Sequence, residues 1–75
     1  MFETLKQILV EEMQVNEADI KPEAELVNDL GINSLELADL IMLCEEKFHI
    51  EINEDDIQNF LTVADVVAFI EKQTA

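Results

Sequence analysis

The sequence predicts an all-α fold: a four-helix bundle with three longer helices, one short third helix, and a long loop between the first and second helices. Apolar residues recur at three- and four-residue spacing in three segments. Capping residues precede the later segments, and no alternating run is convincing as a strand. At 75 residues the chain has the length of one domain, and we expect that domain to span 1–75.

The first helix is expected from Phe2 to Val15. Its apolar residues have helical spacing, and polar side chains lie between them; the apolar set is Phe2, Leu5, Ile8, Leu9 and Met13. We expect the helix to end near Asn16, because the periodicity stops there.

Residues 16–33 lack periodicity and contain Pro22 and Gly31, which predicts a long loop. A loop of this length inside a compact domain is usually functional. Its apolar residues are expected to anchor it to the core: Ile20, Leu26, Val27, Leu30 and Ile32. At Gly31 we expect either a positive φ or a close backbone approach.

The second helix is expected from Ser34 to about Phe48. One face is apolar and predicts core packing; it carries Leu37, Leu40, Ile41, Cys44 and Phe48. The opposite face carries Glu36, Asp39 and Glu46, with Leu35, Met42 and Leu43 among them. Apolar residues among acids indicate either a contact surface for a partner or a face covered by another part of the chain.

Two shorter patterns follow the second helix. Ile50 and Ile52 alternate with Glu51 in a short extended link, after which Asn53 and Asp56 have capping spacing for a brief third helix that would bury Ile57 and Phe60. Thr62 and Asp65 have the same spacing before a fourth helix. Its apolar stripe consists of Val63, Val66, Val67 and Ile70.

The charge balance limits the kinds of partner. Eighteen acidic residues against four basic ones give a net charge of −14, which disfavours nucleic acid and anionic membrane surfaces. The acidity either serves solubility or favours proteins with basic patches. A single cysteine, Cys44, excludes an internal disulfide, and no signal peptide or membrane-spanning run is found. We expect a cytoplasmic monomer without membrane insertion. The start at Met and the absence of linkers favour a separate small protein.

The junction between Asn33 and Ser34 is the most informative position. Ser34 could itself be the N-cap of the second helix. With Asn33 as N-cap, however, Glu36 falls at the third helical position and completes a capping box, and Ser34 becomes the first helical residue. Its hydroxyl is then free beside unpaired N–H groups and the positive end of the helix dipole, where a bound anion such as a phosphodiester is favoured.

The sequence resembles the acyl carrier protein family over nearly its whole length. The likeness rests on the run Asp29-Leu30-Gly31-Ile32-Asn33-Ser34-Leu35, on the acids that follow it, and on the order of the elements. The resemblance implies that Ser34 carries 4′-phosphopantetheine, which a phosphopantetheinyl transferase installs from coenzyme A. The arm's thiol would hold acyl groups as thioesters for acyl-processing enzymes of fatty-acid or related synthesis.

The resemblance also implies roles for other residues. A docking surface for basic patches on partner enzymes would consist of Leu35, Glu36, Asp39, Met42, Glu45 and Glu46. Positions near the family's acyl-chain cavity are Ile41, Cys44 and Phe60, which core packing alone would also explain. One departure is Asn33, where the family usually has Asp; the cap is kept, but a charge that partners could read is lost.

No catalytic or metal-binding set is found. Cys44 and His49 are five residues apart and point about 140° away from each other on a helix, which excludes a nucleophile–base pair. One His and one Cys make no zinc site. We therefore expect a carrier and not an enzyme. Two alternatives stay open: a carrier of polyketide, aminoacyl or D-alanyl groups, and an acidic helical adaptor without a prosthetic group.

Overall fold

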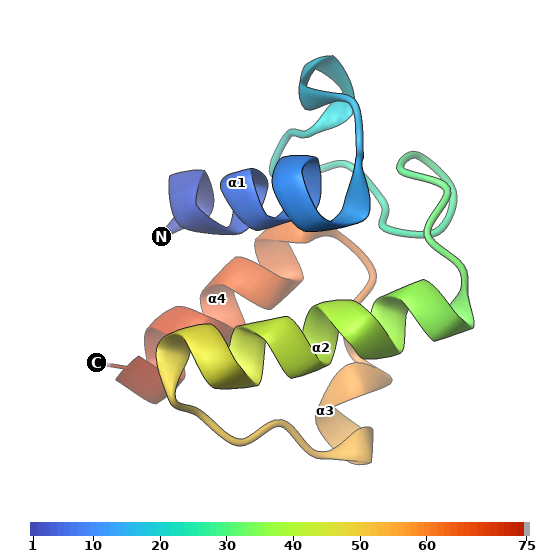
Figure 1. Cartoon of the computed structure of the whole chain (residues 1–75). Coiled ribbons are helices and arrows are strands. Elements are labelled where there is room, and N and C mark those ends of the chain that lie inside the picture. Colours follow the sequence, from blue (N-terminus) through green and yellow to red (C-terminus); the bar gives the residue numbers. More distant parts are fainter. Residues whose placement is uncertain (75) are drawn as a thin grey trace.

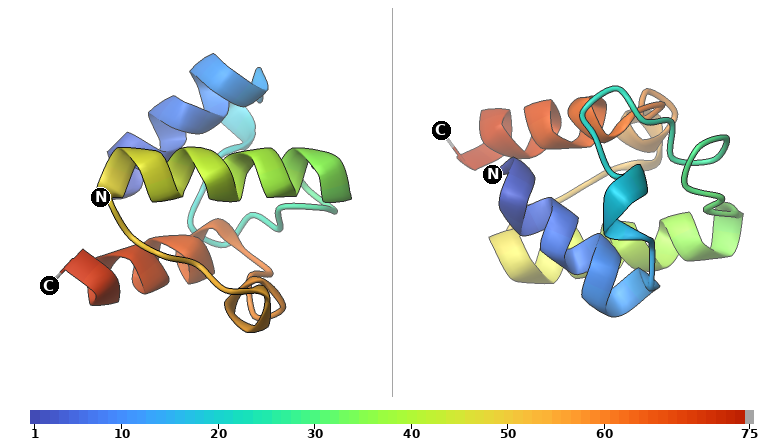
Figure 2. Two further views of the ribbon diagram at one scale, coloured as in Figure 1. Left: turned by 60° about the horizontal axis from the view of Figure 1, so that its bottom comes forward. Right: turned by 90° about the horizontal axis from the view of Figure 1, so that it is seen from above.

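The computed structural model describes residues 1–74 and confirms the all-α fold. Its helices are α1 (Phe2–Met13), a 3₁₀ turn η1 (Glu17–Asp19), α2 (Ser34–Phe48), α3 (Glu54–Ile57) and α4 (Val63–Thr74). Helix α1 packs against both α2 and α4, while the short α3 follows the extended link from α2 (Figure 1). The N-terminus of α2 lies at the opposite end of the molecule from the start of α1 and the end of α4 (Figures 1 and 2).

The first helix ends at Met13, before the predicted boundary near Asn16. Gln14 takes the left-handed conformation with φ 57°, and its N–H donates to the Leu9 carbonyl. This left-handed cap closes the helix without a glycine. Asn16 has a different role, since its side chain accepts an N–H from Ala18 at 2.9 Å and caps η1. The residue expected to end one helix therefore starts the next turn.

The loop before α2 is anchored more firmly than its composition predicts. An isolated antiparallel bridge pairs Glu25 with Thr62, and the Leu26 N–H donates to the Leu61 carbonyl at 3.0 Å. Three of the five predicted anchors are buried: Ile20, Leu26 and Ile32. Leu30 is half-buried, and the expectation for Val27 was wrong, because its side chain is 58% exposed. The bridge directs the Leu26 side chain into the core and leaves the next residue, Val27, at the surface.

The core lies between α1, α2 and α4 and includes loop residues. Its fully buried large side chains come from every long helix and from the loop; they are Leu5, Leu9, Leu26, Ile32, Leu40, Cys44, Val63, Val66 and Ile70. Ile57 of α3 and Phe60 just after it are half-buried, not buried as expected, so this segment covers one side of the core without entering it deeply. Val67 of the predicted α4 stripe is also half-buried. Within residues 1–74, no helix has the length and apolar content needed to cross a membrane.

The two helices after α2 begin as their capping spacing predicts. The Asn53 N–H donates to the Asp56 carboxylate at 3.2 Å. At the start of α4, the Asp65 carboxylate accepts the N–H groups of Thr62 and Leu61, both at 3.0 Å. These bonds lower the pKa of Asp65, with the Thr62 N–H as the larger cause. The contact with Leu61 was not predicted, because a capping box involves only the cap residue.

Gly31 has φ +68°, and a Cβ there would meet no atom within 4 Å. Of the two expectations for this position, the positive φ is confirmed and the close backbone approach is wrong. We predict that Gly31→Ala destabilises the fold by about 1–2 kcal/mol, the usual cost of left-handed backbone for a residue with a Cβ. Gly31→Asn should recover part of the loss, as measured by urea unfolding. An Ala variant as stable as the original chain would contradict this.

Cys44 is fully buried, and burial raises the pKa of its thiol from an ordinary 9.0 to about 11; the nearby Glu45 carboxylate adds to the rise. Between these values the folded chain keeps a proton that the unfolded chain loses. The contribution of the buried neutral thiol to stability is therefore complete below about pH 9 and is lost as the pH rises through about 11. We predict an extra loss of about 2 kcal/mol over this range by denaturant unfolding, absent in Cys44→Ala. Parallel pH curves for both proteins would refute it.

Candidate functional site

The start of α2 has the capping box that the sequence predicts. The Asn33 side-chain oxygen accepts the Glu36 N–H at 2.8 Å, and the Glu36 carboxylate accepts the Asn33 N–H at 3.2 Å. Asn33 has extended backbone, with φ −87° and ψ 179°, and its carbonyl accepts the Leu37 N–H at 2.8 Å. Asn33 is therefore the N-cap, and Ser34 is the first residue with helical backbone.

Ser34 is exposed, and among residues 1–74 its hydroxyl has no hydrogen-bond partner. The N–H groups of the first helical turn point outward here, and the capping box satisfies only the one at Glu36. The positive end of the helix dipole lies at the same place. The hydroxyl is thus available for modification, and an anion attached to it would lie beside N–H donors.

The loop holds this junction in place from the other side. The Ile32 N–H donates to the Leu26 carbonyl at 3.0 Å, and the buried Ile32 side chain lies two residues before Ser34. The Ala64 N–H donates to the Pro22 carbonyl at 2.8 Å, which ties the loop to α4. The exposed Ser34 hydroxyl therefore follows a segment that is hydrogen-bonded to the loop and buried against the core. Leu35 follows it with 80% of its surface exposed.

The acids of the predicted docking surface differ in their surroundings. Asp39 and Glu46 are exposed, and among residues 1–74 they have no salt bridge or side-chain hydrogen bond. Glu36 is engaged in the capping box. Glu45 is half-buried and accepts the Ile52 N–H at 2.9 Å, which ties α2 to the link before α3. The seven-residue separation of that pair matches no capping pattern, so no local sequence pattern could have indicated this hydrogen bond.

The apolar residues predicted for docking and for the acyl-chain cavity differ in how deeply they are buried. Met42 is 57% exposed and stays on the outer face of α2, whereas Leu43 is half-buried. Ile41 and Cys44 are buried in the core. Phe60 is half-buried, and its ring meets that of Phe69 on α4 edge-on, with 5.4 Å between centroids. Ile41 and Cys44 therefore lie in the core, and Phe60 lies at its edge.

Cys44 and His49 do not form a reactive pair. The thiol is inside the core, and its raised pKa is the opposite of what a nucleophilic thiolate needs. His49 caps the C-terminus of α2 in left-handed conformation, with φ 55° and an exposed side chain. Among residues 1–74, no group of three His, Cys, Asp or Glu side chains could hold a metal ion.

Comparison with known proteins agrees with this geometry. The family model described as "Phosphopantetheine attachment site" matches residues 3–70. An acyl carrier protein of Wolinella succinogenes is 42% identical over 71 residues, which cover 95% of this chain and 93% of that protein. Acyl carrier proteins of Solidesulfovibrio magneticus and Helicobacter pylori are each 44% identical over 95% of this chain and 91% of their own.

These matches cover nearly the whole chain and the helix start described above. Proteins of this kind carry a covalently attached 4′-phosphopantetheine, interact with a phosphopantetheinyl transferase and with acyl-processing enzymes, and are carriers rather than enzymes. The chain therefore belongs to the acyl carrier protein family of phosphopantetheine-bearing domains.

Proposed function

We propose that residues 1–75 form a single carrier domain in which Ser34 bears the 4′-phosphopantetheine, and that the protein delivers acyl groups to enzymes of fatty-acid synthesis in the cytoplasm. The observation that supports this most directly is the free Ser34 hydroxyl at the first helical position, relieved of capping by Asn33 and Glu36. When bound, the group supplies a thiol that holds acyl groups as thioesters.

The residues around Ser34 fit the attachment chemistry. The Ser34 oxygen would form a bond to the phosphorus of coenzyme A that bears the pantetheine, while the bond to the adenosine bisphosphate breaks and that group leaves. The hydroxyl proton passes to a base of the transferase. The N–H groups at the start of α2 would then face the negative phosphodiester, and the helix dipole favours that charge.

Two further roles follow from the same proposal. Leu35, Asp39, Met42 and Glu46 would form the exposed part of the docking surface, with Glu36 and Glu45 contributing charge from hydrogen-bonded positions. Ile41, Cys44 and Phe60 would border the acyl chain. Since Ile41 and Cys44 are buried in the packed core, an entering chain would have to displace core side chains.

We predict that a broadly acting phosphopantetheinyl transferase adds one phosphopantetheine to this protein, seen as a single mass increase in the intact protein. Ser34→Ala should gain no mass. The free energy of unfolding of this variant should differ from that of the original chain by less than about 0.5 kcal/mol, because the Ser34 hydroxyl does not cap the helix. A stability loss of about 1 kcal/mol would instead make Ser34 a capping residue. A chain that gains no mass would overturn the proposal.

We predict that the docking acids separate into two classes. Asp39→Lys should slow transfer to acyl-processing enzymes at low salt with no loss of stability, because its carboxylate has no internal role. Glu36→Lys should slow transfer and also destabilise the fold by about 1 kcal/mol, because it removes a capping contact and puts a cation at the positive helix end. Glu36→Gln, which can still cap, is the matched control.

Turnover and thermal unfolding measured on the same samples separate the two effects. Equal stability of Glu36→Lys and Asp39→Lys would show that the capping box contributes nothing to the stability of the fold. Unchanged turnover in Asp39→Lys would remove Asp39 from the docking surface.

A further inference from the structure

The Asn33 side chain uses only half of its amide in the capping box. Its oxygen accepts the Glu36 N–H at 2.8 Å, and because that partner is a donor, the atom facing it must be Oδ1 and not Nδ2. Among residues 1–74, Nδ2 has no hydrogen-bond partner, and the residue is exposed. Since the amide is planar and its oxygen is directed at the helix, the two N–H groups of Nδ2 are turned out of the capping box.

The backbone beside Asn33 supplies further free donors. An α-helix leaves its first N–H groups without partners inside the helix. Here the N–H groups of Glu36 and Leu37 both donate to Asn33, to its side-chain oxygen and its carbonyl. In the described part of the chain, the N–H groups of Ser34 and Leu35 have no acceptor. Unpaired donors from the backbone and from the Asn33 amide therefore meet at the start of α2.

The capping box contains a single negative charge. The Glu36 carboxylate accepts the Asn33 N–H at 3.2 Å, and Asn33 itself is neutral. An Asp side chain at position 33 could accept the same Glu36 N–H, but it would add a second charge and remove both Nδ2 donors. Asn33 therefore keeps the helix cap while making the first turn of α2 more favourable for an anion.

We infer that Asn33 positions the phosphodiester of the prosthetic group, with Nδ2 donating to a phosphate oxygen while Oδ1 remains in the capping box. The inference rests on the proposed attachment at Ser34, the residue next to Asn33. The ligand itself is indicated independently of the helix start, because the phosphopantetheine attachment model matches residues 3–70. Asn33 is thus a positioning residue that fixes the point from which the arm leaves the protein.

Modification should then stabilise the start of α2. An anion at the N-terminus of a helix is favoured by the helix dipole, and an N–H bond to a charged phosphate oxygen is stronger than one between neutral groups. With Asn33 in the cap, this gain is not reduced by a second carboxylate. An Asp at the same place would oppose the phosphodiester by like-charge repulsion, which is strongest at low salt.

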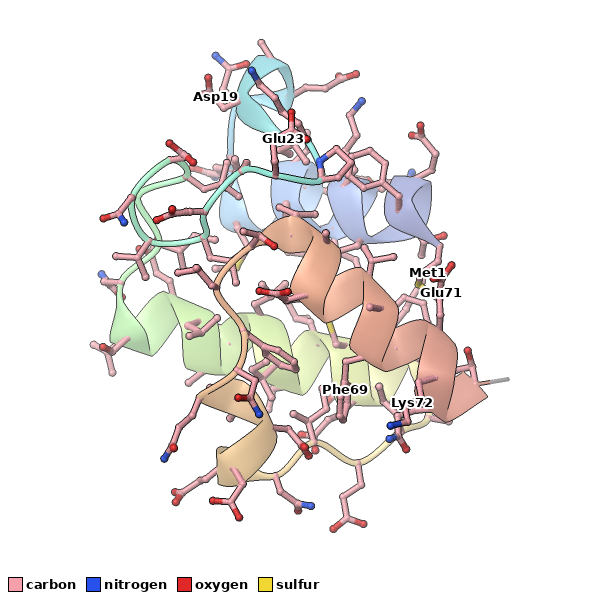
Figure 3. All side chains as sticks on the ribbon, turned by 180° about the vertical axis from the view of Figure 1, so that it is seen from behind. Met1, Asp19, Glu23, Phe69, Glu71 and Lys72 are labelled. Atoms are coloured by element: carbon pink, nitrogen blue, oxygen red, sulfur yellow. The ribbon has the colours of Figure 1, made fainter. Side chains whose placement is uncertain are left out.

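The test compares the melting temperature of each chain before and after complete modification by a broadly acting transferase, verified by intact mass. The original chain should gain about 2–4 °C at low salt. Asn33→Asp, which has the same shape and still caps, should gain less than about 1 °C. The control Gln73→Glu adds the same charge on the last turn of α4, next to Lys72 and at the opposite end of the molecule from the start of α2 (Figure 3). It should gain as much as the original chain.

A further variant separates the amide from the absence of charge. Asn33→Ser is neutral and still caps through its hydroxyl, but it has no amide. Its gain on modification should fall between those of the original chain and Asn33→Asp. At about 0.5 M salt the Asp variant should approach the Ser variant, because only the charge repulsion is screened. A Ser variant that gains as much as the original chain would overturn the role of the amide.

Nitrogen–proton NMR measures the hydrogen bond directly. On modification the side-chain amide protons of Asn33 should move downfield, while those of the four other asparagines stay in place. Equal melting gains for the original chain and Asn33→Asp, or an unmoved Asn33 amide, would overturn this inference and leave modification of Ser34 intact. An original chain that gains no phosphopantetheine mass would overturn the Ser34 proposal, and this one with it.

Discussion

The reciprocal hydrogen bonds between Asn33 and Glu36 are the contact on which the rest of the site depends. They assign the N-cap to Asn33 and so place Ser34 one position later, with its hydroxyl outside the capping scheme. One residue of shift at a helix start decides whether a serine caps the helix or keeps its hydroxyl free of capping. It also explains why Asn can stand where the family usually has Asp, because both side chains accept the same N–H.

The capping box fixes the helix, and the loop fixes where the helix starts in space. The bridge between Glu25 and Thr62 joins the loop to α4, and the buried Ile32 side chain anchors the last residues before Asn33. Gly31 makes the turn between these anchors with a backbone conformation that other residues adopt at a cost. These contacts tie the loop to α4 and to the core, and so determine where α2 starts.

The sequence predicted the parts of this structure that local patterns determine. Helix α2 has the predicted bounds, and the capping spacings at Asn33, Asn53 and Thr62 each correspond to a hydrogen bond in the structure. The failures involve contacts between distant residues. Val27 was placed inside because it is apolar, but a bridge to residues more than thirty positions away turns it outward. The early end of α1 at Gln14 had no glycine or proline to mark it.

Sequence patterns were also insufficient for the docking surface. Family resemblance assigned four acids to one face as equivalent charges, because sequence spacing cannot show which carboxylates are already hydrogen-bonded. The structure shows that Glu36 and Glu45 hold backbone N–H groups, while Asp39 and Glu46 do not. A carboxylate that stabilises its own fold still contributes charge, but it cannot reorient toward a partner without losing that bond. The adaptable charges of α2 are therefore Asp39 and Glu46, whose exposed carboxylates have no hydrogen-bond or salt-bridge partner among residues 1–74.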